Sequence, residues 1–235
     1  MVAASGQGLL WIAAVGILFT LFSQLRTACN LGILERPLAM GLVWGLLIGD
    51  MTLALSVALC FELLWLDLIP AGTFVTPNAA APTLAALALT HFFGFRTAPE
   101  AVFAILFCLP LGWIGSRLEQ MQRGWQNASY NRLLKGIRTS HRAEYAPAGL
   151  ILGSMIQMAV INFVFFCASL LALISLFGLL VSHAPHPLPQ GFIAWGHLWL
   201  AASLGGFLAL RTVRAFSVLA AGVAVLALAG LSLPL

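Results

Sequence analysis

The sequence predicts an all-α membrane protein that crosses the bilayer several times and contains broken or re-entrant helices. The first observation is the composition: of 235 residues, 61% are hydrophobic and only 8% are charged. An ordinary soluble domain carries roughly a quarter charged residues. The second is that apolar segments recur along the whole chain, which indicates a single integral membrane domain over residues 1–235. The third is that prolines and acids interrupt these segments, which indicates broken helices.

Basic residues are concentrated in one polar segment, residues 116–147, which holds six of the eleven Lys and Arg residues. Clusters of this kind beside apolar segments report orientation, and the positive-inside rule places them in the cytoplasm. We therefore expect a basic cytoplasmic connector and no nucleic-acid partner, despite a net charge of +4. Apolar residues recur within it at three- and four-residue steps, which predicts surface helices at the headgroups. A solvated connector and a docking surface for a cytoplasmic partner both remain open.

The sequence contains no strong signature of a metal or cofactor site. Its four cysteines are scattered singly, which indicates neither a disulfide framework nor a zinc site. The five histidines, including His91, are expected to be structural or solvated rather than phosphorylated. We therefore predict no metal and no cofactor.

The first crossing helix is predicted at about residues 8–25. The next apolar region, Pro37 to Ile69, would reach about 50 Å as one straight helix, whereas a hydrocarbon core is about 30 Å thick. We expect it to break near Gly49-Asp50, with a short piece before the break and a nearly complete span after it. Glycines at four-residue spacing predict a face for close helix packing: Gly41, Gly45 and Gly49.

The lengths of later segments also do not match a single regular membrane-spanning helix. Regular helix is not expected from Pro70 to Pro82, because proline removes a hydrogen-bond donor and clashes with the preceding turn. Ala148 to Val181 is again too long for one simple crossing, which predicts a break or a strong tilt. Two overlong segments in corresponding places suit an inverted repeat, although the halves show no clear sequence repeat. Further apolar segments are expected at about 79–95 and 100–115 and around Arg211 and Arg214.

Three acids, Asp50, Glu62 and Asp67, lie in the apolar region that begins at Pro37. An acid in a membrane segment costs about 2.5 to 3.5 kcal/mol on insertion scales, and it usually marks a transport path or a paired site. We favour a functional role for Glu62, because it lies well inside its segment. For Asp50, pairing with Arg36 or capping a half-helix is as well supported as contact with a ligand.

The irregular segment from Pro70 to Pro82 should line a cavity, because backbone at membrane depth must be buried in protein or hydrated. A neutral polyol is bound by hydrogen-bond donors and acceptors over an aromatic or apolar floor. Asn78 could supply such groups, although it could equally cap the helix expected from Ala79. We predict five substrate-binding residues: Glu62, Asn78, Asp67, Thr76 and Trp65.

Two stretches, ERPLAMGLVWGLLIGDM and FELLWLDLIPAGTFVTPNAAAP, resemble a known amino-terminal signature. It is that of the IIC membrane subunit of the mannose/fructose/sorbose class of bacterial sugar phosphotransferase systems. Asn78 replaces the usual acid of that signature, and Asp67 stands where a glycine is common, so the sugar preference is expected to differ. The resemblance implies structural or gating roles for four residues: Arg36, Asp50, Gly72 and Pro77.

The resemblance further implies a sugar-translocating, multi-pass subunit in the bacterial inner membrane that binds a hexose. It would form a hetero-oligomer with a IID membrane subunit, while soluble IIA and IIB proteins relay phosphate from phosphoenolpyruvate. We expect no phosphoryl chemistry in the chain itself, which has no GxxxxGK[ST] phosphate loop.

Two other functions remain open at this point. One is a secondary sugar or small-solute transporter that moves protons through Glu62 or Asp67. The other is an intramembrane aspartyl enzyme that uses Asp50 and Asp67. Against the enzyme, Leu47 stands where a GxGD motif requires glycine.

Overall fold

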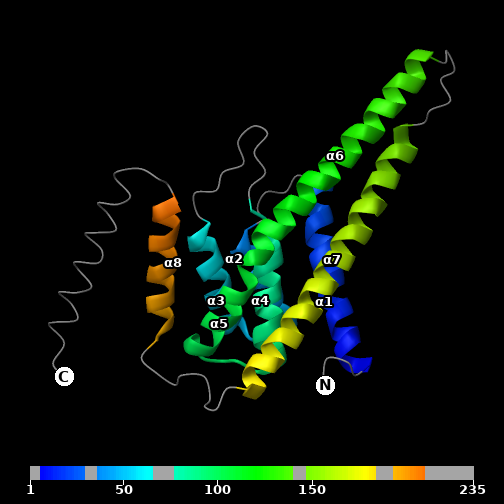
Figure 1. Cartoon of the computed structure of the whole chain (residues 1–235). Coiled ribbons are helices and arrows are strands. Elements are labelled where there is room, and N and C mark those ends of the chain that lie inside the picture. Colours follow the sequence, from blue (N-terminus) through cyan, green and yellow to red (C-terminus); the bar gives the residue numbers. More distant parts are fainter. Residues whose placement is uncertain (1–5, 30–35, 66–76, 140–146, 184–192, 210–235) are drawn as a thin grey trace, which may run out of the picture.

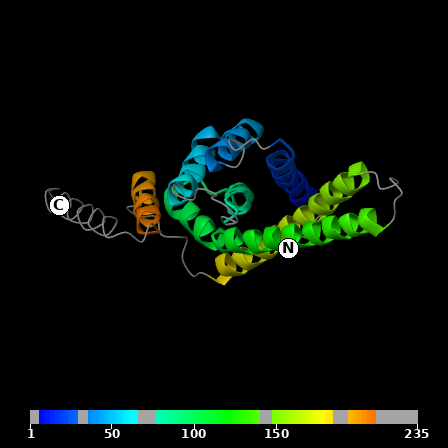
Figure 2. The ribbon, with the colours of Figure 1, turned by 90° about the horizontal axis from the view of Figure 1, so that it is seen from above.

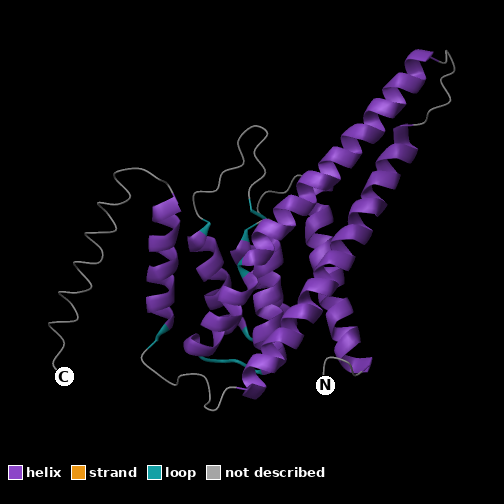
Figure 3. Cartoon of the chain, in the orientation of Figure 1, coloured by secondary structure: helices purple, strands orange, loops and turns teal. Residues whose placement is uncertain are grey.

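The computed structural model describes residues 6–29, 36–65, 77–139, 147–183 and 193–209. These residues form helices without a strand among them, which confirms the predicted all-α class (Figure 1, Figure 3). In chain order the helices are α1 (Gly6–Cys29), α2 (Pro37–Ile48), α3 (Met51–Leu64), α4 (Ala80–Phe93), α5 (Ala98–Cys108), α6 (Pro110–Thr139), α7 (Pro147–His183) and α8 (Trp195–Ala209).

Long and short helices are combined in the described part of the chain. Three stretches are long and apolar enough to cross a membrane: Gly6–Leu25, Ala98–Lys135 and Ile151–Ser182. By contrast, α2 has 12 residues and α3 and α4 have 14 each. Helices of this length reach only about 18 to 21 Å, which is less than the thickness of a hydrocarbon core. The protein is therefore a polytopic membrane protein with broken helices, as its sequence predicts.

The predicted break near Gly49-Asp50 is confirmed. Gly49 ends α2 with φ +84°, a left-handed conformation that glycine adopts without steric cost. The carboxylate of Asp50 then accepts a hydrogen bond from the backbone N–H of Leu53 at 3.2 Å and so caps α3. Since the described helix α3 ends at Leu64, the nearly complete span expected after the break is wrong.

The glycines of α2 have two different roles. A Cβ on Gly41 would lie 2.5 Å from Cβ of Ala58, and one on Gly45 would lie 2.6 Å from Sδ of Met51. These two glycines let α2 and α3 pack closely as an antiparallel hairpin, as the four-residue spacing predicts. A Cβ on Gly49 would meet nothing within 4 Å, so this glycine serves the turn and not the packing.

Helix α4 forms the centre of the molecule. Every residue from 81 to 90 is buried, and the helix contacts α1, α2, α3, α5, α6 and α7. Figure 2 shows α4 end-on inside a ring of the other helices, with α8 outside the ring beside α3. The expectation of no helix as far as Pro82 is wrong, because α4 begins at Ala80. Proline is accepted at this place because the first N–H groups of a helix have no intrahelical acceptor.

The last long helices are continuous where interruptions were expected. As far as the structure describes it, the basic segment forms no separate surface helix, because it continues α6 as one helix of 30 residues to Thr139. Helix α7 runs unbroken through 37 residues and lies inclined beside α6 (Figure 1). A buried amide pair joins these helices, since Gln122 donates a hydrogen bond to Asn162 at 3.1 Å. Asn162 in turn donates to the hydroxyl of Ser23 on α1 at 2.6 Å.

Candidate functional site

The short helices α2, α3 and α4 carry polar side chains at both of their ends. The end that we call the closed end contains Glu62, Trp65 and Asn78, and it adjoins the start of α6. The end that we call the open end contains Asp50, His91 and Arg96, and it lies where α2 turns into α3 and where α4 ends. A 14-residue helix separates the two ends by about 21 Å.

Glu62 at the closed end is paired with Arg36. Its Oε1 accepts a hydrogen bond from Nη1 of Arg36 at 3.1 Å, while only 11% of its side chain is exposed. Its Oε2 accepts a second hydrogen bond from the backbone N–H of Leu38 at 3.3 Å. Leu38 lies in the first turn of α2, whose N–H groups have no partner within the helix. Glu62 therefore joins the end of α3 to the beginning of α2.

Asn78 caps α4 with its side-chain oxygen. This Oδ1 accepts hydrogen bonds from the backbone N–H groups of Ala80 at 3.0 Å and Ala81 at 3.2 Å. The capping role that the sequence leaves open for Asn78 is thus present. Among the described residues, only the oxygen of the Asn78 side chain is hydrogen-bonded, and not its amide nitrogen.

Trp65 and Asn78 come together at the first turns of α6. The backbone N–H of Asn78 donates to the carbonyl of Gly112 at 3.0 Å. A Cβ on Gly112 would lie 3.2 Å from Cζ2 of Trp65, and one on Gly115 would lie 3.0 Å from Cβ of Asn78. The Trp65 ring also stacks on Phe61 with centroids 5.5 Å apart. Gly112 and Gly115 are site-shaping residues that the sequence reasoning missed, because nothing local reveals what a glycine faces.

Four further predicted site residues lie between α3 and α4 in the chain. Pro77 directly precedes Asn78 at the closed end and is half-buried. Asp67, Thr76 and Gly72 lie outside the described residues. The contribution of these three residues to a site therefore stays a prediction.

Asp50 lies at the open end, away from Arg36. Besides capping α3, its carboxylate forms an ion pair with Nη1 of Arg96 at 3.1 Å. The expected capping of a half-helix is confirmed, whereas the expected pairing with Arg36 is wrong, because Arg36 pairs with Glu62. The side chains are 30% exposed for Asp50 and 79% for Arg96, so this pair is in contact with solvent.

A cavity of about 100 Å³ lies beside the Asp50–Arg96 pair. His91 lines it, and its ring centroid is 4.9 Å from that of Trp11 and 6.5 Å from that of Trp44. The other polar and aromatic lining residues are Trp44, Asp50, Thr90, Phe95 and Arg96. The sequence reasoning missed Arg96 and assigned His91 no ligand contact, because only the return of α4 brings them to Asp50.

Comparison with known proteins decides the family. The sequence pattern of the sorbose-specific IIC component of the phosphotransferase system matches residues 10–203. The chain belongs to this family. It is therefore a membrane subunit of a sugar phosphotransferase system, and it works with other components of such a system in the membrane. The resemblance stated from the residues is confirmed, and neither the proton-coupled transporter nor the aspartyl enzyme is favoured.

A solved structure described as "Structure of membrane protein" supports the fold. It has 16% sequence identity to this chain and a TM-score of 0.59, and the match covers 95% of this chain and 87% of that one. At this identity the likeness concerns the fold alone. No curated protein matches the chain.

Proposed function

We propose that the chain is the sugar-translocating IIC subunit of a mannose/fructose/sorbose-class phosphotransferase system, and that it binds a hexose at the closed end. The observation that carries this proposal is the convergence of Trp65 and Asn78 on the first turns of α6, with Glu62 one helical turn before Trp65. An indole, a pair of amide donors and a shielded carboxylate are suited to a neutral polyol.

The hydrogen bonds already made at the closed end leave capacity for a sugar. Each oxygen of Glu62 accepts one hydrogen bond from the protein, and a carboxylate oxygen can accept a second one from a hydroxyl group. Asn78 uses its oxygen for the cap and keeps its amide nitrogen for donation. Trp65 provides an apolar surface for the ring of the sugar. Asp67 and Thr76 follow α3 and precede α4 in the chain, and we assign them further hydroxyl contacts.

The direction of transport follows from the charges on α6. This helix starts at the closed end and carries the exposed cations Arg117, Arg132 and Lys135 along its length. The positive-inside rule then places the closed end towards the cytoplasm of a bacterial inner membrane, where soluble IIA and IIB proteins can deliver phosphate. We assign a IID membrane subunit as the partner within a hetero-oligomer. Phosphoryl transfer then takes place on the partners' residues and on the arriving sugar.

The test is phosphoenolpyruvate-dependent sugar uptake by membrane vesicles that contain this chain, a IID subunit and the IIA and IIB proteins. Glu62→Gln should reduce uptake of mannose, fructose, glucose or sorbose by at least about tenfold, because it removes a charged acceptor. Glu119→Gln is the matched control, since Glu119 is also ion-paired and only 10% exposed but lies on α6. It should transport like the wild type. The amount of each variant in the membrane is measured in parallel.

Two results would contradict the proposal. Wild-type uptake by Glu62→Gln at equal abundance would exclude the closed end as the sugar site. Uptake that needs a proton gradient and neither phosphoenolpyruvate nor the phosphocarriers would favour a secondary transporter instead.

A further inference from the structure

We propose that the cavity at the open end is a second, separate sugar subsite, which binds one hydroxyl-bearing edge of a monosaccharide before the sugar reaches the closed end. This inference rests on the proposed function, because it assigns the cavity a step in the same transport path. The cavity is about 100 Å³ in size and belongs to the ends of α2 and α4 and the start of α3.

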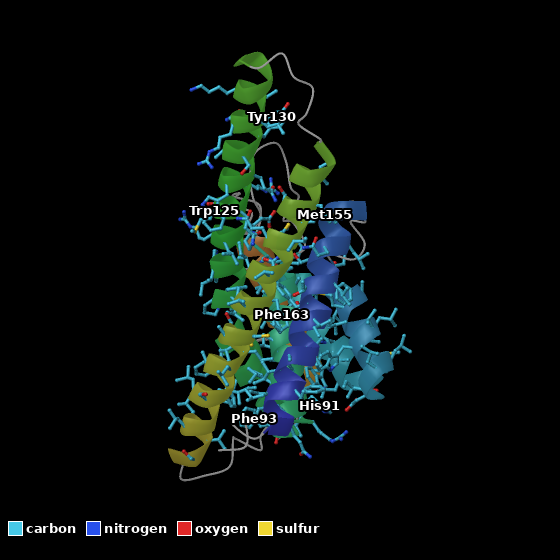
Figure 4. All side chains as sticks on the ribbon, turned by 90° about the vertical axis from the view of Figure 1, so that its right-hand side faces the viewer. His91, Phe93, Trp125, Tyr130, Met155 and Phe163 are labelled. Carbon is cyan, nitrogen blue, oxygen red and sulfur yellow. The ribbon has the colours of Figure 1, made fainter. Side chains whose placement is uncertain are left out.

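The position of the cavity suits entry from the side opposite the basic helix. Asp50 and Gly94 mark the ends of α2 and α4 that lie away from Gly112, where α6 begins. Figure 4 shows His91 near the lower end of the helices, whereas Trp125 and Tyr130 lie towards the upper end of α6. If the basic part of α6 faces the cytoplasm, the cavity faces the opposite side, from which the sugar arrives.

The charges around the cavity favour a neutral ligand over an ion. An anion attracted by Arg96 would meet the carboxylate of Asp50, and a cation attracted by Asp50 would meet the guanidinium of Arg96. A hydroxyl group both donates and accepts, so neighbouring hydroxyls of one sugar can satisfy both partners. Trp44 and Phe95 provide aromatic walls for the C–H faces of a sugar ring, and His91 provides a further ring nitrogen.

The cavity is small, about 100 Å³ in volume. We assign it to one edge of a sugar ring with its neighbouring hydroxyl groups, while the rest of the ring faces the surroundings.

The Asp50–Arg96 pair can respond to a ligand without loss of the fold. Asp50 caps α3 through Oδ1 and contacts Arg96 through Oδ2, so the cap does not depend on the ion pair. Arg96 is 79% exposed, and an ion pair this exposed contributes little to stability. The guanidinium is therefore free to turn towards sugar hydroxyls.

Two substitutions test the subsite while keeping its structural contacts. Asp50→Asn removes the charge and retains a good capping oxygen. His91→Phe removes the ring nitrogens and retains an aromatic ring beside Trp11 and Trp44. Thr52→Ala is the control, because Thr52 is exposed in the first turn of α3 and does not line the cavity.

The measurement is the KM and the maximal rate of phosphoenolpyruvate-dependent uptake in right-side-out vesicles that contain the partner subunits. Mannose, fructose, glucose and sorbose are each tested. Asp50→Asn should raise the KM about tenfold, the loss expected for a hydrogen bond to a charged group, and His91→Phe should raise it about threefold to tenfold, the loss expected for an ordinary hydrogen bond. Both should change the maximal rate less than about twofold. Thr52→Ala should match the wild type. In a second arm, Thr52→Cys should react with an impermeant maleimide added outside the vesicles.

The outcomes separate this inference from the proposed function. An unchanged KM in His91→Phe and in Asp50→Asn, with uptake still lost in Glu62→Gln, would overturn the subsite and leave the closed end in place. Reaction of Thr52→Cys only from the cytoplasmic side would overturn the direction of entry. Absence of phosphoenolpyruvate-dependent uptake by the wild-type complex would reject the proposed function and the subsite with it. If Asp50→Asn does not reach the membrane, His91→Phe decides the kinetic arm.

Discussion

The closed end and the open end of the short helices contain the same kinds of charged group, but these groups are buried to different extents. Each has a carboxylate that binds the first turn of a helix and pairs with an arginine at 3.1 Å. Glu62 is 11% exposed and joins two helices, whereas Asp50 is 30% exposed and caps its own helix. Burial strengthens the interaction and raises the cost of leaving one partner alone. The ion pair at the closed end is therefore suited to fix the positions of α2 and α3. The ion pair at the open end is suited to exchange one of its partners for a ligand.

The glycines at the two ends also have different roles. Gly112 and Gly115 at the closed end make room for Trp65 and Asn78. Gly94 at the open end has nothing within 4 Å of its missing Cβ, and it adopts φ +67° to end α4. The glycines of the closed end are therefore needed for the space that they leave, whereas the glycine of the open end is needed for its left-handed backbone conformation.

The largest effect is expected when the space at the closed end is filled. Gly115→Leu would drive its side chain into Asn78, which should lower the free energy of unfolding by about 1 to 3 kcal/mol and abolish sugar uptake. Thermal unfolding of the purified protein in detergent and uptake in vesicles measure the two effects. The control is Gly124→Leu, since Gly124 lies exposed on the same helix with open space around it. Equal effects of both variants would mean that contact with Asn78 does not matter.

The next largest effect is expected from substitution of Glu62, compared with substitution of Asp50. Glu62→Ala leaves Arg36 and the N–H of Leu38 without their shared acceptor, so we expect a loss of about 1 to 3 kcal/mol in the free energy of unfolding. Glu62→Gln should lose less, because an amide oxygen can still accept. Chemical denaturation followed by tryptophan fluorescence gives these values. A loss no greater than that of Asp50→Ala would contradict the difference in burial as its cause.

A smaller effect is expected at the open end. Asp50→Ala removes the cap of α3 and should cost about 1 kcal/mol, whereas Asp50→Asn should stay within a few tenths because asparagine caps equally well. The same denaturation experiment measures both. Salt provides a second test, because a high salt concentration screens the exposed charges of the Asp50–Arg96 pair and should weaken their interaction. If Asp50→Asn lost as much as Asp50→Ala, the ion pair with Arg96 would outweigh the cap.

The smallest effect concerns the glycine that ends α4. Gly94→Asn should change stability by less than about 0.5 kcal/mol, because asparagine tolerates left-handed backbone, whereas Gly94→Ala should cost about 1 kcal/mol. The difference in unfolding midpoint between these two variants is the measurement. Equal midpoints would show that φ at this position does not limit stability.

Local signals account for the parts of the fold that the sequence predicts. The break at Gly49-Asp50 follows from a left-handed glycine and a capping acid, and both act within a few residues of themselves. The cap formed by Asn78 is equally local. For the apolar run from Ala148 the sequence predicts a break or a strong tilt. The break does not occur, because segment length alone does not interrupt the hydrogen bonds of a helix, and α7 continues through the run.

The choice of ionic partners could not be predicted. The sequence offers Arg36 as a possible partner of Asp50, but the antiparallel hairpin returns Glu62 to Arg36 across 26 positions. The return of α4 brings Arg96 to Asp50 across 46 positions. Ion pairing acts through space, so these partners are decided by the topology of the helices.

The sequence by itself determined the membrane class, the family signature and the break at Gly49-Asp50, because composition and the conformations of glycine and capping residues are properties of short segments. Only the tertiary structure decided that α4 is central, that Trp65 and Asn78 meet at Gly112, and that Asp50, His91 and Arg96 share a cavity. These arrangements depend on close packing between segments distant in the chain, and no local preference specifies which surfaces will meet.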